Sequence, residues 1–220
     1  MNVYMYVIRE LERSLSKCES GCHDCNDGAM HAWDEGVAFY TGTLEGEDGE
    51  GSGKLLYALA DKRCGNYKTC GENKDSLEGT SYVNIEMMND FNLGLQYLYL
   101  GECGTARNIV DKIVDNMAVP MIQGALRYAY KVDKLGGGDK EKAEGAAFSL
   151  AVLPRLAACS EKDAATVYEN MGYNARSTVN FAAVKRAFEN NYRCMQISCD
   201  DIGGLWDGDR NRYYQGFSPC

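Results

Sequence analysis

Residues 1–16, MNVYMYVIRELERSLS, carry the pattern that decides the fold of this chain. Val3, Val7, Leu11 and Leu15 recur at intervals of four, and charged residues fall between them. A spacing of three to four residues places apolar side chains on one face of an α-helix. The stretch is therefore predicted to be an amphipathic helix.

The same apolar spacing of three and four dominates the rest of the chain. The candidate helices are 2–16, 27–44, 53–68, 82–101, 105–131, 139–158, 161–171 and 180–194. Only three of the 220 residues are proline, which suits long helices better than many short strands. The sequence thus predicts an all-α protein that is more than half helical, with no sheet beyond a hairpin.

Some segments are expected to interrupt the helices or to lie outside them. The acidic, glycine-rich stretch EGEDGEGS at 45–52 is expected to be a mobile loop. Pro120 and Pro154 fall inside helical patterns and are expected to kink or break them. The tail 195–220 is rich in glycine and aspartate and is expected to be irregular.

Short strings recur along the chain. DEGVAF at 34–39 resembles AEGAAF at 143–148, and LGEC at 100–103 resembles LAAC at 156–159. Stacked helical hairpins of about 50 residues would produce such matches, each burying its apolar face on the next. Chance similarity of short strings is the alternative. We predict a bundle of stacked helical hairpins with an internal duplication, stapled by disulfides.

Ten cysteines are spread along the chain, an even number typical of disulfides formed in an oxidising compartment. They are Cys18, Cys22, Cys25, Cys64, Cys70, Cys103, Cys159, Cys194, Cys199 and Cys220. Cys22-x-x-Cys25 has the spacing of a zinc knuckle and encloses His23, but a structural zinc site needs a second such pair. Five disulfides are therefore favoured over zinc.

Spacing suggests three of the bridges. Cys64–Cys70 and Cys194–Cys199 are expected because each pair is close enough to close a turn. Cys103–Cys159 is expected because the two residues occupy matched hairpin corners.

The net charge is −9 and the isoelectric point is about 4.8. An acidic surface repels phosphate groups, and no basic stripe is present, so nucleic acids and anionic membranes are expected to be poor partners. No run is long enough to span a membrane, and residues 1–16 lack the continuous apolar core of a secretory signal. Because the cysteines indicate secretion, the chain is expected to be a mature or incomplete form.

Five longer strings form one pattern. They are HAWDEGVAFYTG at 31–42, KLLYALADKRC at 54–64, QGALRYAYKVDK at 123–134, EKAEGAAF at 141–148 with VLPR at 152–155, and NFAAVKRAFENNYRC at 180–194. Together they resemble the iron-assimilating (Fea) proteins of green algae, whose domain is also found in the phytotransferrins of marine phytoplankton. The resemblance runs from about residue 28 to the C-terminus.

This resemblance implies an extracellular or periplasmic protein that assists high-affinity iron uptake together with cell-surface uptake machinery. In the phytotransferrin branch it implies ferric iron bound with carbonate, and it points to the Glu-x-x-Glu string at Glu141 and Glu144. Two segments follow, an N-terminal helix with a cysteine-rich stretch at 1–27 and a Fea-like helical domain at 28–220.

The residues themselves offer one metal-capable helix face. Ferric iron is a hard cation that prefers carboxylates and phenolates and accepts some imidazole. His31, Asp34 and Glu35 lie at positions i, i+3 and i+4 of a predicted helix, so they share a face. The alternative is a solvated helix start, where acidic residues favour the helix dipole.

Glu35 and Glu144 have matching surroundings, each followed by glycine, small apolar residues and phenylalanine. If their helices face each other, two carboxylates meet in one bundle core, which is a known way to hold iron. A salt bridge from these acids to Arg127 or Arg155 is the alternative.

Tyrosines form a further candidate set, because tyrosinate is a strong ferric ligand. Tyr128 and Tyr130 belong to the same string as Asp133, and Tyr57 lies in an earlier predicted helix. Arg127 could hold a carbonate anion beside a tyrosinate. Tyr128 and Tyr130 cannot share one helix face, and core tyrosines with a polar tip are the alternative.

An enzyme is disfavoured. His23 and His31 are the only histidines, and with the cysteines in bridges no Ser/His/Asp or Cys/His set is available. The rival to iron binding is a cell-surface structural or interaction module on the same scaffold. Convergence of His31, Glu35, Glu144 and Asp133 in one ligand sphere separates the two hypotheses.

Overall fold

The computed structural model describes residues 2–23, 25, 27–42, 54–173 and 178–220. Helices make up 68% of these residues, and the described strands form a single short hairpin. The predicted all-α fold is therefore confirmed. The loop expected at 45–52 lies outside the described residues.

The helices follow the predicted segments closely. They are α1 (Asn2–Glu19), α2 (Ala29–Thr41), α3 (Leu56–Tyr67), α4 (Tyr82–Tyr99), α5 (Cys103–Lys134), α6 (Asp139–Cys159), α7 (Glu161–Met171), α8 (Phe181–Glu189) and α9 (Cys199–Ile202). None of the helices in the described part of the chain is long and apolar enough to cross a membrane.

Four helices, α4, α7, α8 and α9, begin where a side chain accepts a hydrogen bond from the first turn. Ser81 Oγ accepts from Asn84 N at 3.0 Å at the start of α4, and Ser160 Oγ accepts from Asp163 N at 3.2 Å at the start of α7. Asn180 does the same for α8. Such caps satisfy backbone donors that a helix leaves unpaired, which fixes these boundaries locally.

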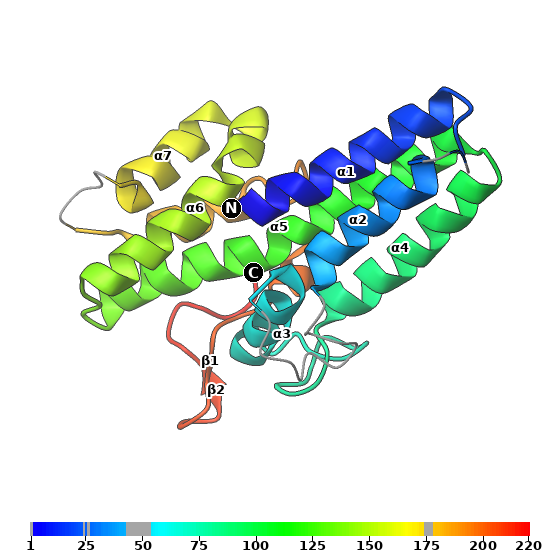
Figure 1. The fold of residues 1–220 in the computed structure, drawn as a ribbon. Coiled ribbons are helices and arrows are strands. Elements are labelled where there is room, and N and C mark those ends of the chain that lie inside the picture. The colour runs from blue at the N-terminus through cyan, green and yellow to red at the C-terminus, as the bar shows by residue number, and fades with distance from the viewer. Residues whose placement is uncertain (1, 24, 26, 43–53, 174–177) are drawn as a thin grey trace.

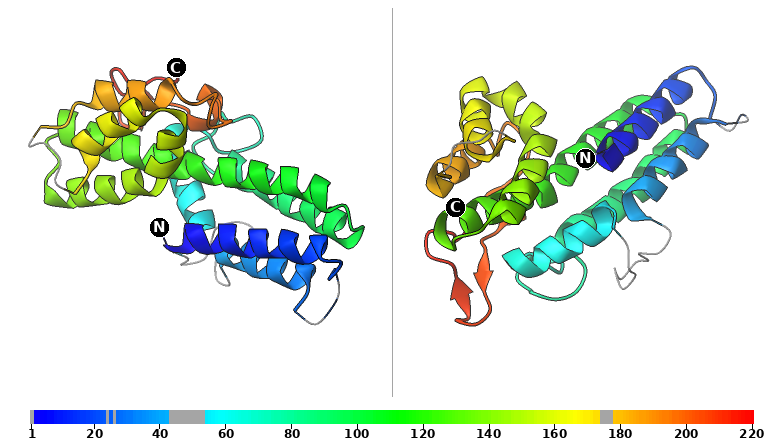
Figure 2. Two further views of the ribbon diagram at one scale, coloured as in Figure 1. Left: turned by 90° about the horizontal axis from the view of Figure 1, so that it is seen from above. Right: turned by 60° about the vertical axis from the view of Figure 1, so that its left-hand side comes forward.

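α5 is the axis of the molecule. It is 32 residues long, and every residue from 117 to 130 is buried apart from Arg127. α1, α2 and α4 lie around its N-terminal half, whereas α6, α7 and α8 gather around its C-terminal half (Figures 1 and 2). α3 packs on the middle of α5 between these groups. The result is a set of stacked antiparallel hairpins.

Pro120 and Pro154 do not break their helices, so that part of the prediction is wrong, whereas the expected kinks stay a prediction. α5 and α6 each continue through the proline as one helix. A proline inside a helix loses one hydrogen bond and costs about 3 kcal/mol. Burial of α5 on all sides around Pro120 stabilises the helix enough to offset that cost.

All ten cysteines are paired, as predicted. The disulfides are Cys18–Cys103, Cys22–Cys25, Cys64–Cys70, Cys159–Cys194 and Cys199–Cys220. The predicted pairing is confirmed for Cys64–Cys70 and wrong for the other two proposed bridges.

Helix lengths explain why Cys103 and Cys159 cannot meet. Cys103 opens α5, which has 32 residues, and Cys159 closes the antiparallel α6, which has 21. The difference of 11 residues leaves Cys159 roughly 16 Å short of the start of α5. Cys103 instead bridges to the end of α1, and Cys159 to Cys194 beyond α8.

The C-terminal tail is irregular apart from one helical turn and a two-stranded hairpin. β1 (Trp206–Asp207) pairs antiparallel with β2 (Arg212–Tyr213). Phe217 anchors the tail, because it is fully buried and contacts the rings of Tyr130 and Phe181. The predicted irregular tail is thus held by aromatic packing and by the Cys199–Cys220 bridge.

Candidate functional site

The face predicted from His31, Asp34 and Glu35 lies where α2 packs on α1. His31 Nε2 is 3.4 Å from Glu35 Oε1, and Asp34 is exposed. Arg13 of α1 lies 3.3 Å from the other oxygen of Glu35, Oε2. The ion-pair partner of Glu35 is therefore Arg13, and not Arg127 or Arg155 as the sequence suggested.

Arg13 is the centre of a charge network between the first two helices. It contacts the buried Glu10 at 3.2 Å and Asp27 at 2.5 Å, and Lys17 also reaches Asp27, at 3.0 Å. The hydrogen bond from Lys17 lowers the pKa of Asp27, and the charge of Arg13 adds to the effect. Each of these carboxylates has a cationic partner, so the network is best explained as a set of ion pairs that holds α1 against α2.

Arg127, Tyr128 and Glu144 come together on the other side of the molecule, around Arg63 of α3. The Arg63 guanidinium lies 5.7 Å from the centroid of the Tyr128 ring, and that of Arg127 lies 5.4 Å from it. Lys131 Nζ is 5.8 Å from the same centroid. We call Arg63, Arg127 and Lys131 the cationic cluster.

Arg63 is the buried member of the cluster, with 2% of its surface exposed. It donates to Asn66 Oδ1 at 2.9 Å, while its Nε is buried without a hydrogen-bond partner in the described part of the chain. Burial and the positive charge of Arg127 lower the pKa of Arg63 to about 10. The fold thus holds a charged group in its interior where the charged form is disfavoured.

The cationic cluster lacks a matching set of carboxylates. Among the described residues, none of its three members forms an ion pair within 4 Å. The negative charges of Glu144 and Glu141 act on the cluster from α6, on Arg63 and Lys131 respectively. Burial and the charge of Arg127 lower the pKa of Lys131 as well. An arrangement of this kind favours the binding of an anion.

Sequence reasoning missed Arg63, although the sequence holds a signal for it. Leu56, Ala60 and Arg63 recur at the helical spacing of three and four, so Arg63 falls on the apolar face of its helix. A charged residue on such a face is costly to bury without a partner, which makes it a candidate functional group.

The remaining predicted ligands have structural partners. Glu141 Oε2 accepts from Gly138 N at 3.1 Å and so caps the start of α6. Asp133 accepts from Phe181 N at 2.8 Å and holds the start of α8. Tyr130 packs among the aromatic rings that anchor the tail, and Tyr57 is buried beneath α4 with its carbonyl accepting from Asn84.

His31, Glu35, Glu144 and Asp133 do not form one ligand sphere. In the described part of the chain, a single group of at least three His, Cys, Asp or Glu side chains has its ligand atoms within 4.8 Å of one another: Cys18, His23 and Cys103. Cys18 and Cys103 are joined as a disulfide, so their sulfurs are not available as thiolate ligands. The metal role of each predicted ligand therefore stays a prediction.

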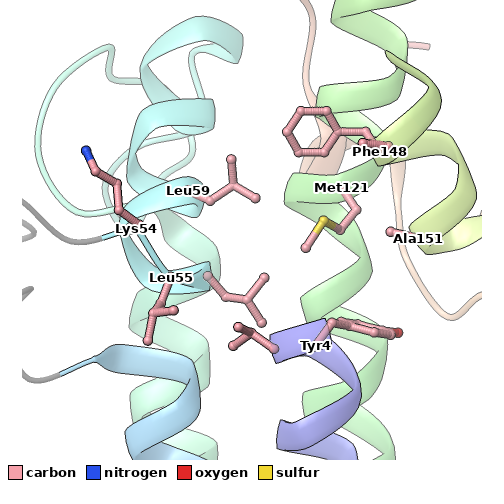
Figure 3. A pocket seen from close by; sticks show the side chains of 10 residues that line it. Tyr4, Lys54, Leu55, Leu59, Met121, Phe148 and Ala151 are labelled. Carbon is pink, nitrogen blue, oxygen red and sulfur yellow. The ribbon is translucent and has the colours of Figure 1, made fainter. Parts of the chain in front are cut away.

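An apolar cavity of about 250 Å³ lies next to the cationic cluster, between α3, α5 and α6 and above the start of α1 (Figure 3). Its walls include Leu59, Met121, Phe148 and Ala151, with Lys54 at its edge. The Phe148 ring belongs to both features, because the Arg63 guanidinium lies 5.2 Å from its centroid.

Residues 2–203 match the model of the Fea1 family, described as low iron-inducible periplasmic proteins. The chain belongs to the Fea1 family. The match begins at residue 2, so the family domain includes the N-terminal helix, which showed no resemblance in the sequence. The predicted division at residue 27/28 falls between α1 and α2, which pack together in the structure.

Membership of the Fea1 family confirms the predicted resemblance and the extracellular or periplasmic location. It also ties the protein to iron, since the family is described as induced at low iron. No curated protein and no solved structure matches the chain. The cationic cluster is built from the family-like strings at 54–64 and 123–134, and Glu144 beside it belongs to the string at 141–148.

Proposed function

We propose that this protein binds ferric iron together with a small anion in the periplasm and delivers it to cell-surface uptake machinery. The role is binding rather than catalysis. The site is the region where Glu144 and Tyr128 adjoin the cationic cluster. The single observation that carries the proposal is the buried guanidinium of Arg63 beside Arg127, which has no ion-pair partner among the described residues and whose Nε has no hydrogen-bond partner.

Electrostatics require the anion. Three cations around one tyrosine ring repel a trivalent metal ion, and at low dielectric that repulsion is strong. A dianion such as carbonate neutralises two guanidinium groups and still presents oxygen atoms to the metal. Arginine suits this task, because its fork of N–H donors binds planar oxyanions in a bidentate manner.

The chain itself supplies hard ligands beside the anion. Glu144 is partly exposed and has no ion-pair partner among the described residues, and its charge acts on Arg63. Tyr128 lies at the centre of the cluster and offers a phenolate. Carboxylate and phenolate oxygens are the donors that ferric iron prefers.

The rival is a structural or interaction module built on the same scaffold. It draws support from the predicted ligands that have structural partners, such as Glu35 with Arg13 and Asp133 with the start of α8. That argument does not extend to the cationic cluster, since a scaffold gains no stability from unpaired buried charge.

Dependence of iron binding on the anion tests the proposal. Ferric nitrilotriacetate is titrated into the metal-free protein in bicarbonate-free buffer and again with bicarbonate. We expect tight ferric binding only when bicarbonate is present. Ferric binding to Arg127→Gln is expected to lose this dependence on bicarbonate. Lys134→Gln, an exposed lysine on the same helix, is the control and is expected to behave as the wild type. Absence of ferric binding under both conditions would leave the rival module standing.

A further inference from the structure

The apolar cavity and the cationic cluster adjoin at the Phe148 ring, and the residues that form them lie one turn apart on two helices. On α3, Leu59 lines the cavity and Arg63 follows four residues later on the same face. On α6, Phe148 lines the cavity and Glu144 precedes it by four residues. One helical turn, about 5.4 Å, therefore separates the apolar residue from the charged residue on each of these helices.

α5 joins the cavity to the cluster. Met121 lines the cavity, and Tyr128 lies seven residues, or two turns, further along the same face. Between them the Phe148 ring packs directly on Gly124, where any Cβ atom would meet the ring at 2.6 Å. Phe148 also stacks on Tyr128, with the ring centroids 5.7 Å apart. The aromatic surface is thus continuous from the cavity to the cluster.

We propose that the cavity and the adjoining Arg63 together bind a small amphipathic organic anion, with an apolar ring in the cavity and a carboxylate on Arg63. The inference rests on the proposed function and deepens it, because it names the chemical class of the anion that accompanies ferric iron. An organic carboxylate would use the same guanidinium as carbonate and would add apolar contacts that carbonate lacks.

The size and lining of the cavity define the ligand. A cavity of about 150 Å³ holds benzene, so the present volume of about 250 Å³ accepts one ring with a short substituent. The lining is mainly valine, leucine, methionine, alanine and phenylalanine side chains. Its polar groups are the Lys54 ammonium at the edge and the Tyr4 hydroxyl, which is buried without a hydrogen-bond partner in the described part of the chain. The Tyr4 hydroxyl can accept or donate one hydrogen bond but carries no charge, so a ligand's negative charge needs a cation at the edge of the cavity or beside it.

Two cations compete for that charge. Lys54 lies at the edge of the cavity and is exposed, so its ammonium is already well hydrated. Arg63 is buried, lacks a partner at Nε and touches the aromatic wall of the cavity. A carboxylate binds more strongly to a cation that is poorly hydrated than to one that water already surrounds. This difference favours Arg63 over Lys54.

Benzoate and acetate are the probes, titrated calorimetrically into the metal-free full-length chain. Benzoate is expected to bind roughly 10- to 100-fold more tightly, because burial of a ring adds apolar contacts at constant charge. Ala151→Phe fills the cavity and is expected to abolish this preference while acetate still binds. Arg63→Met is expected to lose both ligands, and Lys54→Met to retain both.

Equal affinity for benzoate and acetate would overturn the inference. So would loss of binding in Lys54→Met with normal binding in Arg63→Met. Should Ala151→Phe fail to fold, as judged by circular dichroism, Leu59→Phe makes the same test from α3. Ferric titration in bicarbonate distinguishes the two failures. Iron binding without benzoate binding removes this inference alone. Benzoate binding without iron binding removes the proposed function, and leaves an organic-anion site that has no part in holding iron.

Discussion

Replacing Arg63 by methionine should stabilise the protein when no anion is present. Arg63 is buried and its pKa is lowered to about 10, which corresponds to roughly 3 kcal/mol against the charged form in the folded state. Because the folded state binds this proton less tightly than the unfolded state, the cost is present in full below the lowered pKa, including at neutral pH.

Two interactions of Arg63 reduce the expected gain. Its hydrogen bond to Asn66 contributes about 1 kcal/mol. Its contacts with the Phe148 and Tyr128 rings contribute about 1 kcal/mol more. Methionine fills a similar space, so the net effect is a gain of about 1 kcal/mol, or roughly 2–4 °C in melting temperature for a chain of this size.

Scanning calorimetry in buffer free of carbonate and phosphate measures this gain. Added bicarbonate should raise the melting temperature of the wild type and leave Arg63→Met unchanged, since an anion stabilises only the state that binds it. Lys131→Met, which removes a less buried member of the cluster, is the control and should gain little. Destabilisation of Arg63→Met by about 2 kcal/mol or more, with a normal response to bicarbonate, would refute the reasoning.

Three further predictions concern stability. Cys159→Ser/Cys194→Ser opens a loop of 35 residues and should cost about 4 kcal/mol in chemical unfolding, and a cost under about 1 kcal/mol would show that the bridge is not a staple. Gly124→Ala should destabilise by about 1–3 kcal/mol, because its Cβ collides with the Phe148 ring, and an unchanged melt would contradict the packing. Burial raises the pKa of Asp61, so the folded state holds that proton more tightly and this group's contribution to stability falls as pH rises above 3.8. Melts of Asp61→Asn across that range should show a weaker fall, and an identical pH profile would refute the assignment.

The helices were predictable because their signal is local. Spacings such as Val7, Leu11 and Leu15 determine which face of α1 is buried, and all three residues are buried in the structure. A break at the prolines was wrongly expected because propensity describes an isolated helix, whereas α5 is supported along its length by its neighbours.

The disulfides also differ in whether their pairing has a local signal in the sequence. Cys64–Cys70 closes a turn, so spacing alone predicted it. Cys18–Cys103 depends on where α1 ends relative to the start of α5, which follows from packing over 85 residues and has no local signal.

The matching strings around Glu35 and Glu144 have a packing explanation. Gly36 lies against Leu11 of α1, and Gly145 lies against Tyr128 of α5, so each glycine marks a close helix crossing. The likeness thus records two similar helix contacts, since Glu35 pairs with Arg13 whereas Glu144 has no ion-pair partner among the described residues. The strings also contain Arg127, Tyr128 and Glu144, which lie near one another, and the helical spacing of Arg63 places it on an apolar face, but its position beside them follows from the contact between α3 and α5.

The most direct test of iron binding beside the cationic cluster compares Glu144 with Glu35, two glutamates whose neighbouring sequences match. Ferric nitrilotriacetate is titrated, with bicarbonate present, into Glu144→Gln and into Glu35→Gln. Glu144→Gln is expected to weaken ferric binding by about a hundredfold with little change in melting temperature, since the amide keeps the shape and loses the charge. Glu35→Gln is expected to bind iron normally and to melt slightly lower, because Arg13 loses one partner. Unchanged ferric binding in Glu144→Gln, or its loss in Glu35→Gln, would contradict the assignment of the site.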